Sequence, residues 1–358
     1  MDWLDVAEDA ISSVAEANIP VVGVFQNLRR FSDDPVGSTA NIVSLFAPPV
    51  TMAMALKSAI TGESNIGGAG STPIIAAGLS VLNDMLEQCG VGDPEHGDAF
   101  RNEAAGFGEL RQEIVDAGSP RSWQGAASQA YAYKNAIQQA RVSAIAESDN
   151  GIAKVLTTEA EQLAATRTVI NAGIRYLNLC IPVAIGLGAL PEGGTLASYG
   201  YQLRVVAETV PAAAIRFSSM GKNASINAGN VRSAVAGFSK ASEPSPPSPC
   251  HPSGRLAVVT TGLRQSAEKQ ISVASKVKSV TIDLAGAAGD VLRSHGTVCQ
   301  GTSTAIGDAA TEHAEAAAFV RSECLELADK LRTAADMYDS TDRYWASRLK
   351  GLESIHRR

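Results

Sequence analysis

Aromatic residues are scarce in this chain and make up 5% of its 358 residues, although hydrophobic residues make up 45%. The apolar side chains are mostly those of Ala, Val, Ile and Leu, which suit close helix–helix packing better than a thick sandwich core. Basic residues are also few: 30 Lys and Arg stand against 37 Asp and Glu, the net charge is -7, and no basic stripe is visible. A nucleic-acid partner is therefore not expected.

Cysteine and histidine are rare as well, with five residues of each type. The cysteines are widely spaced and form no Cys-x-x-Cys pair, which argues against a disulfide framework and against a zinc finger. His295 and Cys299 are four residues apart, but no second ligand pair accompanies them, so we predict no metal site. The odd number of cysteines leaves open a disulfide between two chains, with Cys180 and Cys299 as candidates.

Signatures of catalysis are missing too. The chain has no GxSxG, no Walker A loop, no HExxH and no GxGxxG after a strand. A convincing strand pattern is absent, and the nearest approaches are two short apolar runs at 21–25 and 256–260. We therefore expect an all-α protein that is not an enzyme and needs no cofactor.

The first residues do not form a secretory signal, because Asp2, Asp5 and Glu8 stand where a positive region would be needed. Residues 35–56 and 176–191 are uncharged and apolar, but prolines interrupt both. The second stretch is also shorter than the ~20 residues that span a bilayer. We expect buried or peripheral helices in these places and keep membrane contact as an alternative.

A proline-rich segment marks the clearest boundary. Five prolines fall within residues 242–254, a composition that favours an extended linker and cannot continue a helix. We predict N-terminal apolar helices over 1–92, a helical hairpin followed by apolar helices over 93–241, the linker, and a second hairpin over 255–358.

The second hairpin is the more regular. Its last helix has a heptad seam whose apolar residues step by three and four, and Trp345 continues it. The seam consists of Val320, Cys324, Leu327, Leu331, Ala334 and Tyr338. The preceding helix is predicted to carry Leu263 through Val291, with the turn between the two helices at His295-Gly296.

The first hairpin has a helix from about Pro94 to Gly118, a turn, and a long helix that Pro182 and the Gly-rich "AIGLGALPEGG" after it are expected to interrupt. In the long helix, apolar residues recur every seven positions, at Leu156, Leu163, Ile170 and Leu177. The predicted fold is all-α: two long antiparallel hairpins packed as an elongated four-helix bundle, with extra short apolar helices at the N-terminus.

Two short motifs have a physical logic in such hairpins. Trp123-Gln124-Gly125 places a glycine where the chain reverses and a tryptophan where it can cover the open end of a hairpin core. Tyr338 and Asp342 are four residues apart and share one helix face. Plain packing of the two aromatics, with Asp342 on the surface, is the alternative for both motifs.

The C-terminal part resembles the EspC family, substrates of the mycobacterial type VII (ESX) secretion system. The likeness rests on "PSGRLAVVTTGLRQSAEKQISVASKVKS", "SHGTVC" at the turn and "LADKLRTAADMYDSTDRYWASRLKGL", and it covers residues 252–353. The N-terminal part is similar to the EspA and EspE family over about 94–190, through "SWQGAASQAYAYKNAIQQ" and "CIPVAIGLGAL". The chain thus reads as a natural fusion of two partners.

The resemblance implies a secreted or envelope-associated, non-enzymatic protein that self-assembles and acts in virulence or in the secretion apparatus. It implies an export signal made of Trp123, Gly125, Tyr338 and Asp342. Tyr338 and Asp342 would face outward, while Tyr344 and Trp345 would hold the terminal helix onto the bundle.

The expected partners are the secretion ATPase, a dedicated chaperone, other ESX substrates and further copies of the chain. A membrane-active protein, a cytosolic helical scaffold and an enzyme joined to an export domain remain the alternatives.

Overall fold

The structure is a computed structural model that describes residues 72–244, 246, 257–281 and 284–356. The predicted helices of residues 1–71, the apolar stretch 35–56 among them, lie outside the described residues, as does most of the proline-rich segment.

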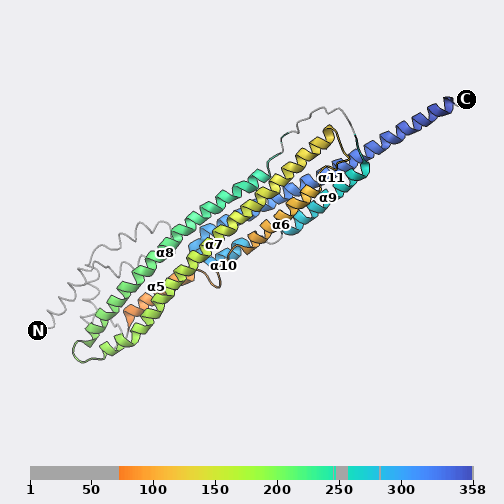
Figure 1. The fold of residues 1–358 in the computed structure, drawn as a ribbon. Helices are drawn as coiled ribbons and strands as arrows, with labels where there is room; N and C mark the ends of the chain where they lie inside the picture. The colour runs from red at the N-terminus through yellow and green to blue at the C-terminus, as the bar shows by residue number, and fades with distance from the viewer. Residues whose placement is uncertain (1–71, 245, 247–256, 282–283, 357–358) are drawn as a thin grey trace. The chain divides into compact units, whose positions relative to one another are not determined.

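The described residues are helical and contain no β-strand, which confirms the all-α class (Figure 1). One isolated antiparallel bridge joins Gln124 and Ala257. The helices are α5 (Pro73–Gln88), α6 (Asp98–Asp116), α7 (Ala126–Gly188), α8 (Gly194–Ala241), α9 (Thr260–Val280), α10 (Ala287–His295), the short 3-10 helix η1 (Thr297–Cys299) and α11 (Gln300–His356).

Helix α7 continues through Pro182, so the expected interruption at this residue is wrong. Proline removes one backbone donor and strains the preceding turn. Here the residues on either side, Leu177, Cys180 and Ala184, are buried, and their packing offsets that local cost. The helix ends only at Gly188, before a turn in which Gly193 has a positive φ of 88°.

The helix predicted to run from Leu263 to Val291 is in fact two helices, because α9 ends at Val280 and α10 begins at Ala287. The Thr281 side chain donates to the carbonyl groups of Val277 and Lys278 at 3.3 and 3.2 Å. Such local hydrogen bonds compete with helix continuation. The apolar periodicity survives the break, since Leu284 and Val291 are both buried.

The chain divides into two compact units, and each unit takes pieces from both sides of the proline-rich segment. The described residues of unit 1 are 72–95, 158–226 and 291–301. Those of unit 2 are 96–157, 227–244, 246, 257–281, 284–290 and 302–356. Helices α7 and α8 therefore contribute to both units.

The core of unit 1 is built by α5, the second half of α7 and the first part of α8. The heptad of α7 supplies Leu163, Ile170 and Leu177, all with no exposed surface. Helix α8 adds a further row of buried apolar residues, and α5 closes the core. Its members from α5 and α8 include Ile75, Leu82, Met85, Val206, Val210, Phe217 and Met220.

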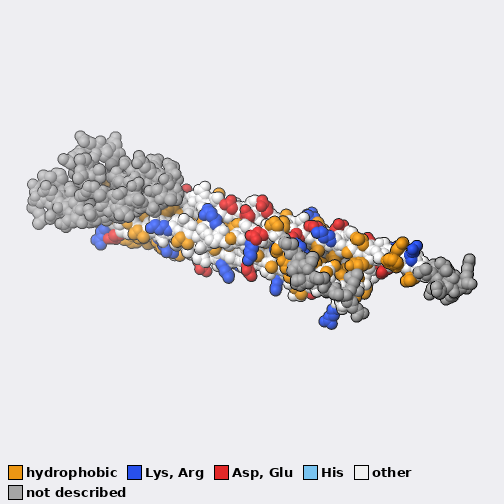
Figure 2. Space-filling model, turned by 90° about the horizontal axis from the view of Figure 1, so that it is seen from above, with side chains coloured by type: hydrophobic (Ala, Val, Ile, Leu, Met, Phe, Trp, Pro, Cys, Tyr) orange, Lys and Arg blue, Asp and Glu red, His pale blue; other side chains and the backbone are white. Residues whose placement is uncertain are grey.

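The core of unit 2 contains the predicted seam of α11. Val320 and Cys324 have no exposed surface, and Leu331 is 3% exposed. Leu327, Ala334 and Tyr338 of the seam are half-buried, and every residue from 341 to 350 is exposed. On the face seen in Figure 2, the acidic and basic side chains of the described residues are interspersed, which agrees with the absence of a basic stripe in the sequence.

Candidate recognition site at the Trp123 turn

The turn between α6 and α7 has a defined backbone structure. The Trp123 N–H donates to the Pro120 carbonyl at 2.9 Å, and the Ser128 hydroxyl donates to the Trp123 carbonyl at 2.9 Å. Gly125 has a φ of 120°, a conformation that residues with a side chain rarely adopt. This is the reason for a glycine two residues after the tryptophan.

Trp123 is buried at this turn, with 5% of its surface exposed. Its ring lies 5.6 Å from that of Tyr131 in the first turns of α7. It belongs to an apolar cluster that also takes residues from α9 and α11. The other buried members are Leu263, Ala267, Ala328, Leu331 and Ala335, and Tyr338 packs against them as a half-buried residue. The structure thus brings the Trp123 turn and the Tyr338 segment together.

Polar side chains of α7 form hydrogen bonds to the end of α6 and so stabilise the turn. The Tyr131 hydroxyl donates to the Ala117 carbonyl, and the Asn135 amide donates to the Ile114 carbonyl at 2.7 Å. These carbonyls belong to the end of α6, where the helix itself offers no donors. Burial raises the pKa of Tyr131, so the hydroxyl keeps its proton and remains a donor.

Two ion pairs connect α9 to α11 at residues 336–339. Arg264 lies 2.8 Å from a carboxylate oxygen of Asp336 and 2.7 Å from one of Asp339. The hydrogen bond from Arg264 lowers the pKa of Asp339. Asp342, one turn beyond, is exposed. The expectation that Tyr338 and Asp342 both face outward is therefore met by Asp342 and only partly by Tyr338.

Tyr344 and Trp345 do not hold the terminal helix onto the bundle, and that expectation is wrong. They are 55% and 58% exposed, and their rings contact each other at 5.4 Å. The reason is that α9 begins at Thr260 and its Arg264 meets α11 at Asp339. Among the described residues, α11 has no buried contact surface beyond that level.

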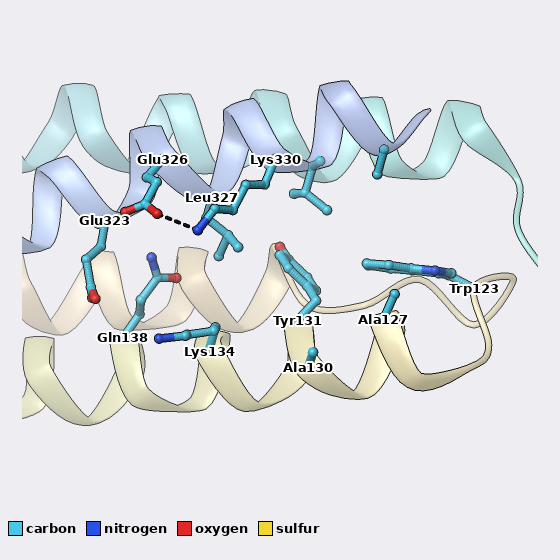
Figure 3. Close-up of a pocket in the computed structure, with 12 residues that line it drawn as sticks. Trp123, Ala127, Ala130, Tyr131, Lys134, Gln138, Glu323, Glu326, Leu327 and Lys330 are labelled. Atoms are coloured by element: carbon cyan, nitrogen blue, oxygen red, sulfur yellow. Dashed lines mark hydrogen bonds and ion pairs between the residues drawn. The ribbon is translucent and has the colours of Figure 1, made fainter. Parts of the chain in front are cut away.

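A pocket of about 330 Å³ lies beside Trp123, between α7 and α11 (Figure 3). Trp123 stands at the turn end of the pocket, with Tyr131 next to it, and Leu327 faces them from α11. The buried Trp123 Nε1 has no hydrogen-bond partner among the described residues. The mostly apolar lining of the pocket can accept an apolar group.

The rim of this pocket is charged. Glu326 and Lys330 of α11 form an ion pair, and Lys134 of α7 lies across from them (Figure 3). The hydrogen bond from Lys330 lowers the pKa of Glu326. The arrangement of an apolar floor under a charged rim resembles small protein-recognition sites rather than catalytic centres.

The remaining residues selected from the sequence lie in unit 1. His295 is completely buried at the end of α10, and its Nδ1 lies 2.9 Å from a carboxylate oxygen of Glu159. Gly296 has a φ of 74°, and a side chain there would overlap the backbone that follows α5. The sequence predicted the glycine turn but gave no sign of Glu159, which is 136 residues away from His295.

Cys180 and Cys299 are both buried, at 4% and 0% exposure. Burial, reinforced by the nearby Glu159 carboxylate, raises the pKa of the Cys299 thiol. A buried protonated thiol reacts slowly. A disulfide between two chains through either residue would require the helices around it to open.

Unit 2 contains a second buried polar cluster that the sequence did not indicate. His313 Nε2 lies 3.3 Å from a carboxylate oxygen of Asp149 and 3.7 Å from one of Glu103. Phe107 and Phe238 flank the imidazole edge-on, at 5.4 and 5.2 Å between ring centroids. Burial raises the pKa of Asp149. The cluster therefore contains two carboxyl groups and one imidazole, so one imidazole cannot form an ion pair with both carboxylates at full charge balance.

Helix α7 is long and apolar enough to cross a membrane, judged by length and composition alone. Only 28% of its most apolar stretch is buried. Tyr176, Leu179 and Val183 are 44%, 75% and 48% exposed among the described residues of unit 1. This leaves the membrane alternative open.

Comparison with known proteins gives two family matches. Residues 89–172 match the EspA/EspE family, and residues 253–351 match the family described as "Excreted virulence factor EspC, type VII ESX diderm". The first match contains the Trp123 turn, and the second contains the Tyr338 segment. No solved structure matches the chain.

Curated relatives agree with the first match. The "ESX-1 secretion-associated protein EspE" of Mycolicibacterium smegmatis is 35% identical over 181 residues, which is 49% of this chain and 34% of the relative. The "ESX-1 secretion-associated protein EspA" of Mycobacterium tuberculosis is 24% identical over 129 residues, covering 36% of this chain and 33% of the relative. The chain spans about a third of the length of these relatives. It joins an EspA/EspE-like region and an EspC-like region in one polypeptide, the fusion that its sequence indicates.

Proposed function

We propose that this protein is a substrate of a type VII (ESX) secretion system, exported as a folded helical protein without catalytic activity. The support comes from the two family matches and from relatives whose names associate them with ESX-1 secretion. The observation that carries the proposal is the single apolar cluster that contains Trp123 and receives Tyr338.

The geometry of this cluster suggests how one chain could supply a composite export signal. The EspA/EspE-like region contributes the Trp123 turn, and the EspC-like region contributes the helix end with Tyr338 and Asp342. Within unit 2 they meet without a second protein. On this proposal the secretion ATPase and a dedicated chaperone bind to one surface of unit 2. This surface consists of Asp342, the exposed part of Tyr338 and the pocket beside Trp123.

The end of α11 offers these partners a further surface. Tyr344, Trp345 and Leu349 are 55%, 58% and 61% exposed. Large apolar side chains exposed on one helix end are a common mark of a protein-binding segment. We include them in the proposed recognition surface instead of the packing role that the sequence suggested.

Export of point variants tests this proposal. Asp342→Ala and Tyr338→Ala should lower the amount in the culture filtrate at least about tenfold relative to the lysate, the ratio that a loss of about 1.4 kcal/mol in recognition produces. Met337→Ala is the matched control, since Met337 is 65% exposed in the same turn and lies outside the motif. Melting temperatures should stay close to that of the parent for Asp342→Ala.

Normal export of both variants would refute the composite signal. Recovery of the parent protein only from the lysate, also in a strain with an active secretion ATPase, would instead favour the cytosolic scaffold. The same proposal includes a virulence role, other ESX substrates as partners and an envelope or extracellular destination. Each of these requires that the protein is exported.

Self-association is part of the proposal as well. Its support is the exposed apolar row at the end of α11 and the isolated apolar residues of α8, among them Ile215 and Ile226 at 68% and 62% exposure. Because the cysteines of the described residues are buried, assembly should not require a disulfide through any of them. Light scattering on the pure chain tests this, and a monomer at all concentrations would contradict it.

A membrane-active function is the second candidate, and the exposed apolar part of α7 favours it. Liposomes loaded with a fluorescent dye would release it on addition of the pure protein if this end inserts. Leu179→Asp should then abolish release, since Leu179 is 75% exposed and a charge there opposes insertion. Equal release by Leu179→Asp and by the parent would argue against this candidate.

A further inference from the structure

Three side chains with metal-binding atoms meet in the core of unit 1. Glu159 comes from α7, His295 ends α10 and Cys299 ends η1, so three separate segments supply them. Their ligand atoms all lie within 4.8 Å of one another, and each residue has no exposed surface. A carboxylate, an imidazole and a thiol in one place form a mixed donor set rather than a surface acidic patch.

The orientation of His295 is fixed by the backbone. Its Nε2 lies 3.1 Å from the Glu95 carbonyl oxygen, which can only accept a hydrogen bond, so Nε2 carries a proton and donates it. Nδ1 then points toward the cluster, 2.9 Å from Glu159 Oε1. Histidines that bind metals usually donate their second ring N–H to a carbonyl or carboxylate in this way.

The charges of these three side chains can balance the charge of a divalent cation. Without a metal, the short contact between His295 Nδ1 and Glu159 Oε1 holds one proton, and the neutral Cys299 thiol holds another. A divalent cation would replace both protons. Its charge would then be balanced by the carboxylate and the thiolate, so no net charge would be left buried by these three residues.

Neighbouring residues hold the ligands in place. Arg167 donates to the carbonyl groups of Cys89, Gly92 and Ser294, at 2.7 Å and 2.6 Å for the first two. It thereby joins the end of α5 to the residue before His295, and its charge is engaged by these carbonyl oxygens. The glycine at 296 permits the close approach of the two backbone segments. Such a rigid frame favours metal binding because the ligands need little reordering.

We propose that Glu159, His295 and Cys299 form a binding site for a divalent transition metal, with Zn²⁺ as the ion that fits best. Zinc accepts sulfur, nitrogen and oxygen ligands in one tetrahedral site, whereas Mg²⁺ and Ca²⁺ require oxygen ligands. Three protein ligands leave one position for water.

Metal content of the purified full chain tests the proposal. The protein is kept reduced, stripped with a chelator, incubated with Zn²⁺ and dialysed before elemental analysis. The parent and Cys324→Ser should retain one Zn²⁺ per chain, because Cys324 is an equally buried thiol in unit 2. Cys299→Ser and Glu159→Gln should retain none, and added Zn²⁺ should raise the melting temperature only where it binds.

Co²⁺ supplies a readout that does not depend on any variant. Bound to the parent chain, it should show the thiolate-to-metal absorption of a cysteine-ligated site, and Zn²⁺ should displace it. Cys89→Ser should keep this absorption, because Cys89 is a buried thiol of the same core that lies outside the three-residue group. A parent chain that retains no Zn²⁺ and shows no thiolate absorption with Co²⁺ would overturn the proposal, as would equal binding by Cys299→Ser.

Discussion

Truncation of Trp123 should destabilise unit 2 strongly, because this side chain joins the α6–α7 turn to α9 and α11. Only 5% of it is exposed, and it contacts a cluster whose members come from three helices and the turn. Replacement of a buried tryptophan by alanine typically costs about 3–5 kcal/mol. The value should lie at the lower end here, for two reasons.

First, Trp123 borders a pocket of about 330 Å³, so water and neighbouring side chains can enter the space that the indole leaves. Second, its Nε1 has no partner among the described residues, and removal of an unsatisfied buried donor returns about 1 kcal/mol. We therefore expect Trp123→Ala to lower the free energy of unfolding by about 3 kcal/mol.

The chain contains its own matched control. Trp345 is the same residue type but is 58% exposed, so Trp345→Ala should change stability by no more than about 0.5 kcal/mol. Urea unfolding followed by circular dichroism gives the free energies. Hydrogen exchange of the α9 amides then shows whether the loss is in unit 2. The same loss in both variants, or less than about 1 kcal/mol for Trp123→Ala, would refute the packing account.

Two further predictions concern buried groups. Because burial raises the folded-state pKa of Asp149 above its ordinary value of 3.8, its stabilising contribution is present at low pH and is lost as the pH rises through that raised pKa. Asp149→Asn should therefore weaken the fall of the urea midpoint as the pH rises above about 4; an unchanged slope would contradict this. Gly296→Ala should lower the free energy of unfolding by at least about 2 kcal/mol, because residue 296 has a φ of 74° and an added Cβ would overlap backbone atoms. Gly289→Ala is the control: its Cβ would meet open space, so thermal melts should show a neutral or stabilising effect. Equal effects of the two substitutions would contradict this account.

The sequence predicted the helical class and most of the apolar seams, because periodicity along a helix is a local property. Leu163, Ile170 and Leu177 are buried as their seven-residue spacing indicated, and so are Val320 and Cys324. These features depend on spacing along one helix.

The features that the sequence did not reveal depend on contacts between distant segments. Glu159 could not be connected with His295 before the chain was folded, since one acidic residue on a helix looks like any other. Pro182 was expected to end a helix because its local cost was visible, while the packing that offsets it was not. Trp345 continues the seam by spacing, but the partner helix α9 begins at Thr260 and does not extend far enough to cover it.

The division of the chain into units has a consequence for the order of events during synthesis. Unit 1 needs residues 291–301 to complete its core and unit 2 needs α11, so unit 1 stays unfinished until about five-sixths of the chain is made, and unit 2 until the last sixth is made. Domains that are contiguous in sequence fold one after another as they emerge. Here both units take their last segment from the C-terminal part of the chain, so neither is complete when its first segments emerge. A protein built in this way gives a chaperone a long interval in which to bind the nascent chain before either core closes.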